Sequence, residues 1–341
     1  MAEFYEWLRE GCRRRELGAP KDVPEKMLQN VSEDGALSGR CDNVLAEEKM
    51  QIAKSQLSLE PMGSVLGARV HGLDLSKPYG DDVKRELREA FAHHLVLCVP
   101  GQDLSYDDQV RFASVFGKAD EKQISKDEKG EGKSRERGVM YVTNIRENGK
   151  QVGSLPDGEM QFHSDGSHRD IPYRATSLWA MQVPSRGGET KFANLYAAYD
   201  ALPESTKLRI EGKQCKFIYQ VDATFREQTR EDDPTLSNAV HPLVKVHPDT
   251  GRKSLYLSRL MTRYIIGMDR AESEALLADL FDHAEKPEFV YAHPWKPKDI
   301  VIWDNRCTNH ARNDFPADEL RQLRRITVSE PGDTSASSAG Y

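Results

Sequence analysis

A histidine and an aspartate two positions apart, His163 and Asp165, are well suited to bind one metal ion. Side chains at i and i+2 of an extended segment project on the same side of the chain, so the imidazole and the carboxylate can reach the same ion. The surrounding segment, QFHSDGS over 161–167, is polar and contains a glycine. Such a segment is equally typical of an ordinary surface loop, and these two residues alone leave both interpretations open.

A third ligand has to come from elsewhere, and among the ten histidines His310 has the most suggestive position. It follows the apolar segment DIVIWD, 299–304, after a short polar turn. A strand that ends at such a turn places the imidazole at the mouth of the fold. Two histidines and one carboxylate form the facial triad of non-haem Fe(II) oxygenases, which leaves coordination positions open for substrate chemistry.

A basic cluster follows this histidine and suits a carboxylate ligand beside the metal. Arg321, Arg324 and Arg325 belong to RQLRRITVS, 321–329, whose end alternates like a strand. Residues four apart share one face of a strand, so we expect Arg321 and Arg325 to face the metal and Arg324 to face away. Guanidinium groups bind carboxylates through paired hydrogen bonds. Alternatively, all three are surface residues paired with the acidic residues at 318–319.

The composition is that of a globular protein with a charged surface: 341 residues, 38% hydrophobic, 30% charged, net charge −7. The negative charge argues against a nucleic-acid partner, because phosphate binding needs clustered Lys and Arg. No apolar run approaches the roughly 18 residues of a membrane span, and no secretory signal is visible. The five cysteines form no C-x-x-C pair, which is typical of a reduced cytosol. We expect a cytoplasmic homo-oligomer that acts on a small molecule, without nucleic-acid or membrane partners.

Short apolar segments with strand-like patterns dominate the middle of the chain. They are 60–76, 95–102, 139–145, 175–183, 215–221, 254–258, 299–304 and 325–329. Apolar residues recur at helical spacing in 81–94, after Ser105, and in 271–284, where Asp269 is the expected N-cap. Many short strands and few helices favour a mainly β (α+β) fold, with a sandwich or barrel core and peripheral helices.

Composition also predicts three parts of the chain. Residues 1–55 are rich in Lys, Arg and Glu and predict an N-terminal helical extension, whereas 56–330 hold the main domain. The small polar residues of 331–341 predict a disordered tail. Inside the main domain, 118–138 is almost entirely charged and predicts a solvated loop rather than a binding arm.

Four motifs in a specific order make the sequence resemble the taurine dioxygenase and 2,4-dichlorophenoxyacetate dioxygenase family of Fe(II)/2-oxoglutarate-dependent enzymes. The motifs are QFHSDGS at 161–167, PSRGGETKFANLYAAYDALP at 184–203, HPLVKVHPDTGRKSLY at 241–256, and VIWDNRCTNHARNDF at 301–315 followed by RRITV at 324–328. The resemblance covers residues 56–330 and implies a double-stranded β-helix, or jelly roll. It also implies Fe(II) as cofactor, with 2-oxoglutarate and O2 as cosubstrates.

The resemblance assigns roles to individual residues of this chain. His163, Asp165 and His310 match the family's iron ligands. Thr190 and Arg321 match the residues that bind the far carboxylate of 2-oxoglutarate.

Further residues match positions around the primary substrate. Arg325 and His94 match residues that hold its anionic end, although His94 also fits a helix C-terminal residue. Phe162 matches a bulky aromatic residue beside the substrate, and Glu159 replaces a polar amide, which argues against simple taurine oxidation. The polar segment 222–238 matches the family's lid.

The resemblance implies a dioxygenase that hydroxylates a C–H bond of a small, anionic organic substrate while 2-oxoglutarate is decarboxylated to succinate and CO2. The same residues also support desaturation, cyclisation or other tailoring of a natural product. A metal-dependent hydrolase or a non-catalytic jelly-roll binder is the remaining alternative. No G-x-S-x-G or Ser-His-Asp pattern offers a competing nucleophile.

Overall fold

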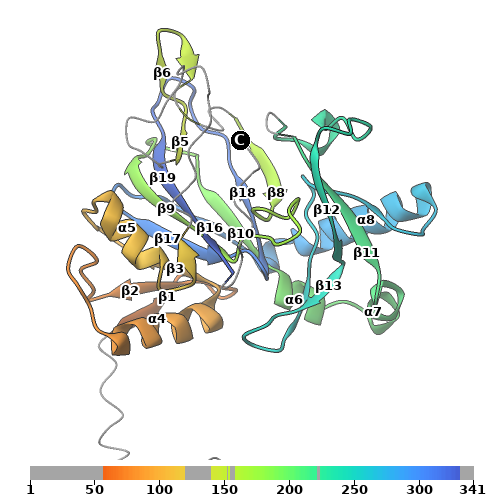
Figure 1. Ribbon diagram of the computed structural model, residues 1–341, viewed down its shortest axis with the longest axis horizontal. Coiled ribbons are helices and arrows are strands. Elements are labelled where there is room, and N and C mark those ends of the chain that lie inside the picture. The colour runs from red at the N-terminus through yellow and green to blue at the C-terminus, as the bar shows by residue number, and fades with distance from the viewer. Residues whose placement is uncertain (1–56, 120–139, 152, 154–157, 221–222, 331–341) are drawn as a thin grey trace, which may run out of the picture. The chain divides into compact units, whose positions relative to one another are not determined.

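Two β-sheets pack against each other in the computed structural model, which describes residues 57–119, 140–151, 153, 158–220 and 223–330 (Figure 1). The large, eight-stranded sheet has the order β1-β2-β3-β17-β9-β19-β4, with β5 also paired to β19. Its strands are β1 (Ser58–Pro61), β2 (Ala68–His71), β3 (Val96–Val99), β17 (Ile300–Asp304), β9 (Ala175–Gln182), β19 (Gln322–Ser329), β4 (Lys118–Ala119) and β5 (Met140–Thr143). All pairs in it are antiparallel except β2 with β3.

The smaller, four-stranded sheet supplies much of the candidate site and has the order β16-β10-β18-β8. Its strands are β16 (Val290–His293), β10 (Thr190–Asn194), β18 (Thr308–Arg312) and β8 (Met160–His163). A three-stranded sheet has the order β12 (Ser237–Pro242), β11 (Gln214–Tyr219), β15 (Thr262–Ile265). Two hairpins complete the pairings of the described residues: β13 (Val244–Val246) with β14 (Lys253–Leu255), and β6 (Arg146–Glu147) with β7 (Lys150–Gln151).

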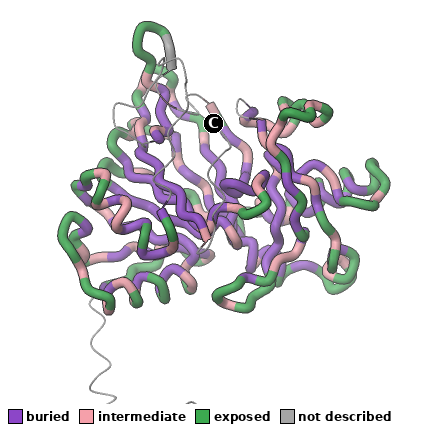
Figure 2. Tube along the Cα trace, viewed as in Figure 1, coloured by how far each residue is buried: buried purple, intermediate pink, exposed green. Residues whose placement is uncertain are grey.

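Strand β17 shows why the large sheet is buried on both faces. All of its residues are at most 1% exposed. Ile300 and Ile302 pack into the core under the helices, whereas Val301 and Trp303 pack into the core between the two sheets, beside Phe192 of β10. A strand covered on both sides reads as a continuous apolar run, as the segment IVIW does (Figure 2).

Helices α4 (Asp81–His94) and α5 (Tyr106–Ala113) cover the outer face of the large sheet (Figure 1). Val83, Leu87 and Phe91 of α4 are buried there, at the spacing that the sequence predicts. The predicted cap at Ser105 is confirmed, because its hydroxyl and the Asp108 side chain form a reciprocal capping box.

A second helical layer packs with the three-stranded sheet on the other side of β8 and β10. It contains α6 (Leu195–Asp200), α7 (Glu204–Ile210), α8 (Arg270–Ala284) and the short 3-10 turns η1 (Arg226–Gln228) and η2 (Pro287–Phe289). Helix α8 buries the predicted apolar face. Its N-terminus is capped by Asp269, which accepts hydrogen bonds from the backbone N–H groups of Ala271 and Glu272.

The predicted mainly β fold with peripheral helices is therefore confirmed, and the predicted strands differ from the observed ones by a few residues at their ends. Strand β19 begins three residues before the predicted segment 325–329. The predictions for 1–55, 331–341 and most of 118–138 lie outside the described residues. In the part of the chain that the structure describes, no helix is both long and apolar enough to cross a membrane.

Candidate active site

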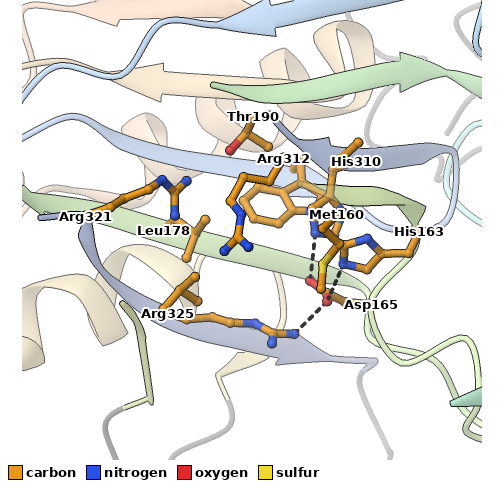
Figure 3. A pocket seen from close by; sticks show the side chains of 12 residues that line it. Met160, His163, Asp165, Leu178, Thr190, His310, Arg312, Arg321 and Arg325 are labelled. Carbon is orange, nitrogen blue, oxygen red and sulfur yellow. Dashed lines mark ion pairs between the residues drawn. The ribbon is translucent and has the colours of Figure 1, made fainter. Parts of the chain in front are cut away.

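Three buried side chains converge between the two sheets, as the sequence predicts (Figure 3). His163 ends β8, Asp165 follows two residues later, and His310 lies in β18 directly opposite His163. The Nε2 atoms of His163 and His310 lie 3.9 and 3.8 Å from the two carboxylate oxygens of Asp165. The possible ligand atoms all lie within 4.8 Å of one another, so one ion can contact all three side chains.

The protonation of this triad suits a divalent metal ion. Nδ1 of His163 lies 3.0 Å from the carbonyl oxygen of Gln161 and must donate, which leaves the Nε2 lone pair directed toward Asp165. Burial lowers the pKa values of His163 and His310. Burial alone would raise the pKa of Asp165, but Arg325 and both imidazoles hold it well below its usual value. Neutral imidazoles and an ionised carboxylate are the forms that bind metal.

A β-bulge in β8 changes which side chains of this strand face the site. His310 pairs with His163 and Arg312 pairs with Met160, so four residues of β8 face three residues of β18. The extra residue allows Met160 and His163 both to line the same pocket. Phe162, between them, packs instead into the core beside α8.

A chain of hydrogen bonds from the large sheet fixes the carboxylate of Asp165. The hydroxyl of Thr176, on β9, donates to its Oδ2 atom over 2.6 Å. The Asn305 amide donates to that hydroxyl oxygen over 2.9 Å, and the Trp303 indole donates to the Asn305 carbonyl over 3.0 Å. Partners of this kind orient a metal ligand before the ion binds.

The turn between β17 and β18, which carries the chain toward His310, is anchored by a buried ion pair. The Asp304 carboxylate accepts hydrogen bonds from Nε and Nη2 of Arg306, over 2.8 and 2.6 Å. His247 lies 3.1 Å from the same carboxylate. Because Arg306 also bonds to Asp249 and Glu330, every carboxylate around it is paired.

Arg306→Ala is expected to lower the free energy of unfolding by about 3–5 kcal/mol, because it leaves the Asp304 carboxylate buried without its main partner. Urea unfolding of wild type and variant measures the difference. The matched control is Arg209→Ala, which breaks an exposed pair with Glu272 and is expected to cost less than about 1 kcal/mol. Equal losses in the two variants would contradict the anchoring role of Arg306.

The triad opens into a pocket between the sheets. Its lining residues are Val142, Met160, His163, Asp165, Leu178, Thr190, Trp303, His310, Ala311, Arg312, Arg321 and Arg325. They come from both sheets, and Figure 3 shows Arg312, Arg321 and Arg325 near the triad, with Leu178 among them.

Arg321 is a buried cation that lines the pocket. It is 2% exposed, and within the described residues no carboxylate pairs with it. Its Nε atom lies 3.3 Å from the carbonyl oxygen of Gly188, and burial, with Arg312 nearby, lowers its pKa to about 9. A Cβ atom at Gly188 would lie 3.3 Å from Arg321 atoms, so glycine lets the two segments approach. Thr190, which is 3% exposed, lines the same pocket.

The predicted orientations of the arginines are confirmed. Arg325 faces the pocket with its Nη2 atom 2.8 Å from Asp165, whereas Arg324 points the other way and donates to Gln109 on α5. The exposed fractions of the three arginines are only 2–6%, so the alternative that they are surface residues is wrong.

Three residues predicted to touch the substrate do not line this pocket. His94 is half-buried at the C-terminal end of α4, where its carbonyl accepts from the Gly67 N–H over 2.9 Å, as a helix-terminal residue does. Phe162 packs into the core on the face of β8 opposite to His163, and Glu159 is exposed before that strand. These contacts are implied by the family resemblance, and they stay predictions.

The sequence interpretation missed Arg312. This residue is 6% exposed, lines the pocket, and donates from Nε to the carbonyl oxygen of Gly158 over 2.9 Å. Arg312 follows His310 at i+2 on the same strand, so the rule that paired His163 with Asp165 would have placed it on the metal side. Figure 3 shows its guanidinium directed into the pocket between Arg321 and the triad.

Two histidines and a carboxylate between the sheets of a jelly roll, beside a buried arginine without an anion, define the site of a non-haem iron oxygenase. Comparison with known proteins agrees. The family model described as taurine catabolism dioxygenase TauD, TfdA family matches residues 58–327.

Relatives and solved structures support the same assignment. Pentalenolactone F synthase of Streptomyces avermitilis is 32% identical over 78% of this chain and 92% of its own length. The 2,4-dichlorophenoxyacetate dioxygenase of Cupriavidus pinatubonensis is also 32% identical, over 79% and 96%. A crystal structure of AAD-2 in complex with Mn(II) and N-oxalylglycine has a TM-score of 0.67 and 34% identity, covering 80% of this chain and 98% of that one.

The chain therefore belongs to the TauD, TfdA family. It is an Fe(II)- and 2-oxoglutarate-dependent dioxygenase with O2 as the second cosubstrate. The predicted family, reaction class and cofactors are confirmed.

Proposed function

We propose that this dioxygenase hydroxylates a C–H bond of a small organic anion, with 2-oxoglutarate decarboxylated to succinate and CO2. The observation that carries the proposal is the grouping of three buried arginines, Arg312, Arg321 and Arg325, around one pocket that also holds the triad. Arg325 pairs with Asp165, whereas Arg321 is buried with no carboxylate partner among the described residues. A pocket lined by three guanidinium groups suits two anions, the cosubstrate and the substrate.

Each residue of the pocket has a distinct task in this proposal. His163, Asp165 and His310 would hold Fe(II), which together with bound 2-oxoglutarate and O2 supplies the oxidising chemistry. Arg321 and Thr190 bind the far carboxylate of 2-oxoglutarate and so fix the angle at which its other end reaches the triad.

The primary substrate is bound on the side of Arg325 and Arg312. The apolar lining of the pocket, with Val142, Met160 and Leu178, suits an uncharged body attached to the anionic group. Segment 223–236 supports a lid role, because it is hydrogen-bonded to β8: Gln161 N–H donates to the Thr224 carbonyl over 3.0 Å. Its position next to the strand of His163 would let it cover a bound substrate.

A succinate assay with candidate anions tests the proposal. Purified protein with Fe(II), 2-oxoglutarate and O2 is given a phenoxyacetate, a phenoxypropionate, an alkyl sulfate and a sulfonate, one class at a time. Substrate-dependent succinate is expected from at least one of these anionic classes. The expected product is the hydroxylated substrate or, where the new hydroxyl group lies beside the heteroatom, the fragments of its collapse: a phenol with an oxo acid, or an aldehyde with sulfate or sulfite. Succinate formation stimulated only by uncharged analogues would contradict the anionic substrate.

Tailoring of a natural product is a second candidate, favoured by the 32% identity to pentalenolactone F synthase. Mass spectrometry of the product distinguishes the two, because desaturation removes two hydrogen atoms whereas hydroxylation adds one oxygen atom. A cytoplasmic location and a homo-oligomeric state stay predictions. The described cysteines, Cys98, Cys215 and Cys307, are buried and unbridged, which fits a reducing compartment.

A further inference from the structure

The hydroxyl of Thr190 has a hydrogen-bond partner that does not line the pocket. The indole Nε1–H of Trp295 donates to the Thr190 oxygen over 3.0 Å. Trp295 lies just after β16 and is half-buried, and it does not line the pocket itself. It therefore reaches the cosubstrate site only through Thr190.

The direction of this hydrogen bond has a chemical consequence. An indole N–H can only donate, so the Thr190 oxygen is the acceptor and its own hydrogen is left to donate elsewhere. Thr190 lines the pocket that also contains Arg321, which likewise can only donate. The far end of the cosubstrate site thus consists of donors, which a carboxylate satisfies and an amide N–H or a methyl group does not.

We propose that Trp295 is a positioning residue that fixes the Thr190 hydroxyl as a donor and so makes the site selective for a 2-oxo acid with a far carboxylate. This assignment rests on the proposed role of Thr190 and Arg321 in binding 2-oxoglutarate. It adds a residue outside the pocket that determines which cosubstrate the pocket accepts.

Neighbouring residues hold the indole in this orientation. His293, which is fully buried, packs edge-to-face against Trp295 with ring centroids 4.7 Å apart and an interplanar angle of 90°. Its Nε2 atom lies 3.5 Å from the carboxylate of Asp299, which accepts the Lys296 N–H over 3.1 Å and closes the turn after Trp295. His293 is also directly opposite Thr190 in the pairing of β10 with β16. The same strand pair therefore positions the hydroxyl and its donor.

Calorimetric titration of the full-length protein loaded with Mn(II) tests the assignment without turnover. The ligands are 2-oxoglutarate and 2-oxopentanoate, which has the same carbon chain and lacks the far carboxylate. Trp295→Phe removes the N–H and keeps an aromatic ring, and is expected to weaken 2-oxoglutarate binding by about three- to tenfold. Binding of 2-oxopentanoate is expected to change by less than about twofold, because it makes no bond to the oriented hydroxyl.

A matched control and a second variant separate this role from packing. Trp179→Phe also removes an indole hydrogen bond, to the Gln102 carbonyl over 2.9 Å, and is expected to leave the preference between the two acids unchanged. If Trp295→Phe does not fold, benzothienylalanine at position 295 keeps the bicyclic shape without the N–H and is expected to give the same loss.

A double-variant cycle tests whether Trp295 acts through Thr190. Thr190→Val is expected to weaken 2-oxoglutarate binding by at least about tenfold, and adding Trp295→Phe is expected to cause no further loss. Additive losses, or equal weakening of both acids by Trp295→Phe, would overturn the assignment. Failure of the wild-type protein to bind 2-oxoglutarate at all would instead contradict the proposed function.

Discussion

Asp165→Ala is expected to abolish iron retention and to lower succinate formation by at least about a hundredfold. This loss is expected to be larger than that from removing a residue that only hydrogen-bonds to a metal ligand. Asp165 supplies the only carboxylate of the triad, and its two oxygens lie 3.9 and 3.8 Å from the imidazoles of His163 and His310. Without it, two neutral histidines beside the Arg325 guanidinium remain, and a cationic neighbour repels a divalent ion. Iron content after dialysis and succinate formation measure the two effects.

Two further variants serve as comparisons for Asp165→Ala, one beside the triad and one on the surface. Thr176→Val keeps the carboxylate but removes the hydroxyl that orients it, and is expected to weaken metal binding by about 10- to 100-fold. Asp282→Ala removes an exposed aspartate on α8 and is expected to retain iron fully. If Asp165→Ala folds and retains iron as wild type does, the triad is not the metal site.

Arg321→Ala is expected to raise the 2-oxoglutarate concentration needed for half-maximal activity by at least about a hundredfold. The side chain is 2% exposed and has no carboxylate partner among the described residues, so we expect the far carboxylate of 2-oxoglutarate to pair with this buried charge. Removing one partner of a buried ion pair costs about 3–5 kcal/mol, and every 1.4 kcal/mol is about tenfold in affinity. Steady-state rates at varied 2-oxoglutarate give the value.

The neighbouring arginines are matched controls on the same strand. Arg324→Ala removes a buried guanidinium that bonds to Gln109 on α5, so we expect lower stability with an unchanged 2-oxoglutarate requirement. Arg325→Ala is expected to impair mainly the binding of the primary substrate. A similar rise in the 2-oxoglutarate requirement for Arg321→Ala and Arg325→Ala would contradict the division of roles between them.

The grouping of His163, Asp165 and His310 and the approximate positions of the core strands could be predicted because they follow from local rules. Alternation in β19 separates Arg324 from Arg325, which lines the pocket, and the polar turn after β17 leads into the strand that carries His310 of the triad. Each of these inferences needs only the period of a strand and the position of a turn.

The substrate side of the site could not be predicted in this way. Alternation places Phe162 opposite to His163, yet the bulge in β8 is what allows Met160 and His163 to share the pocket, and a bulge has no reliable signature in one sequence. His94 lies at the C-terminal end of α4 and does not line the pocket, so its contact with the substrate stays a prediction. Trp295 reaches the site through its hydrogen bond to Thr190, which depends on the pairing of β10 with β16. The partners in such a pairing are set by the tertiary fold.

Mixing the purified protein with Fe(II) and 2-oxoglutarate under anaerobic conditions tests the central claim most directly. Chelation of Fe(II) by the keto acid within the triad of His163, Asp165 and His310 predicts a weak visible charge-transfer band. The band should disappear on admission of O2 as succinate accumulates, and it should be absent from Asp165→Ala. A folded wild-type protein that shows no band and forms no succinate would contradict the account.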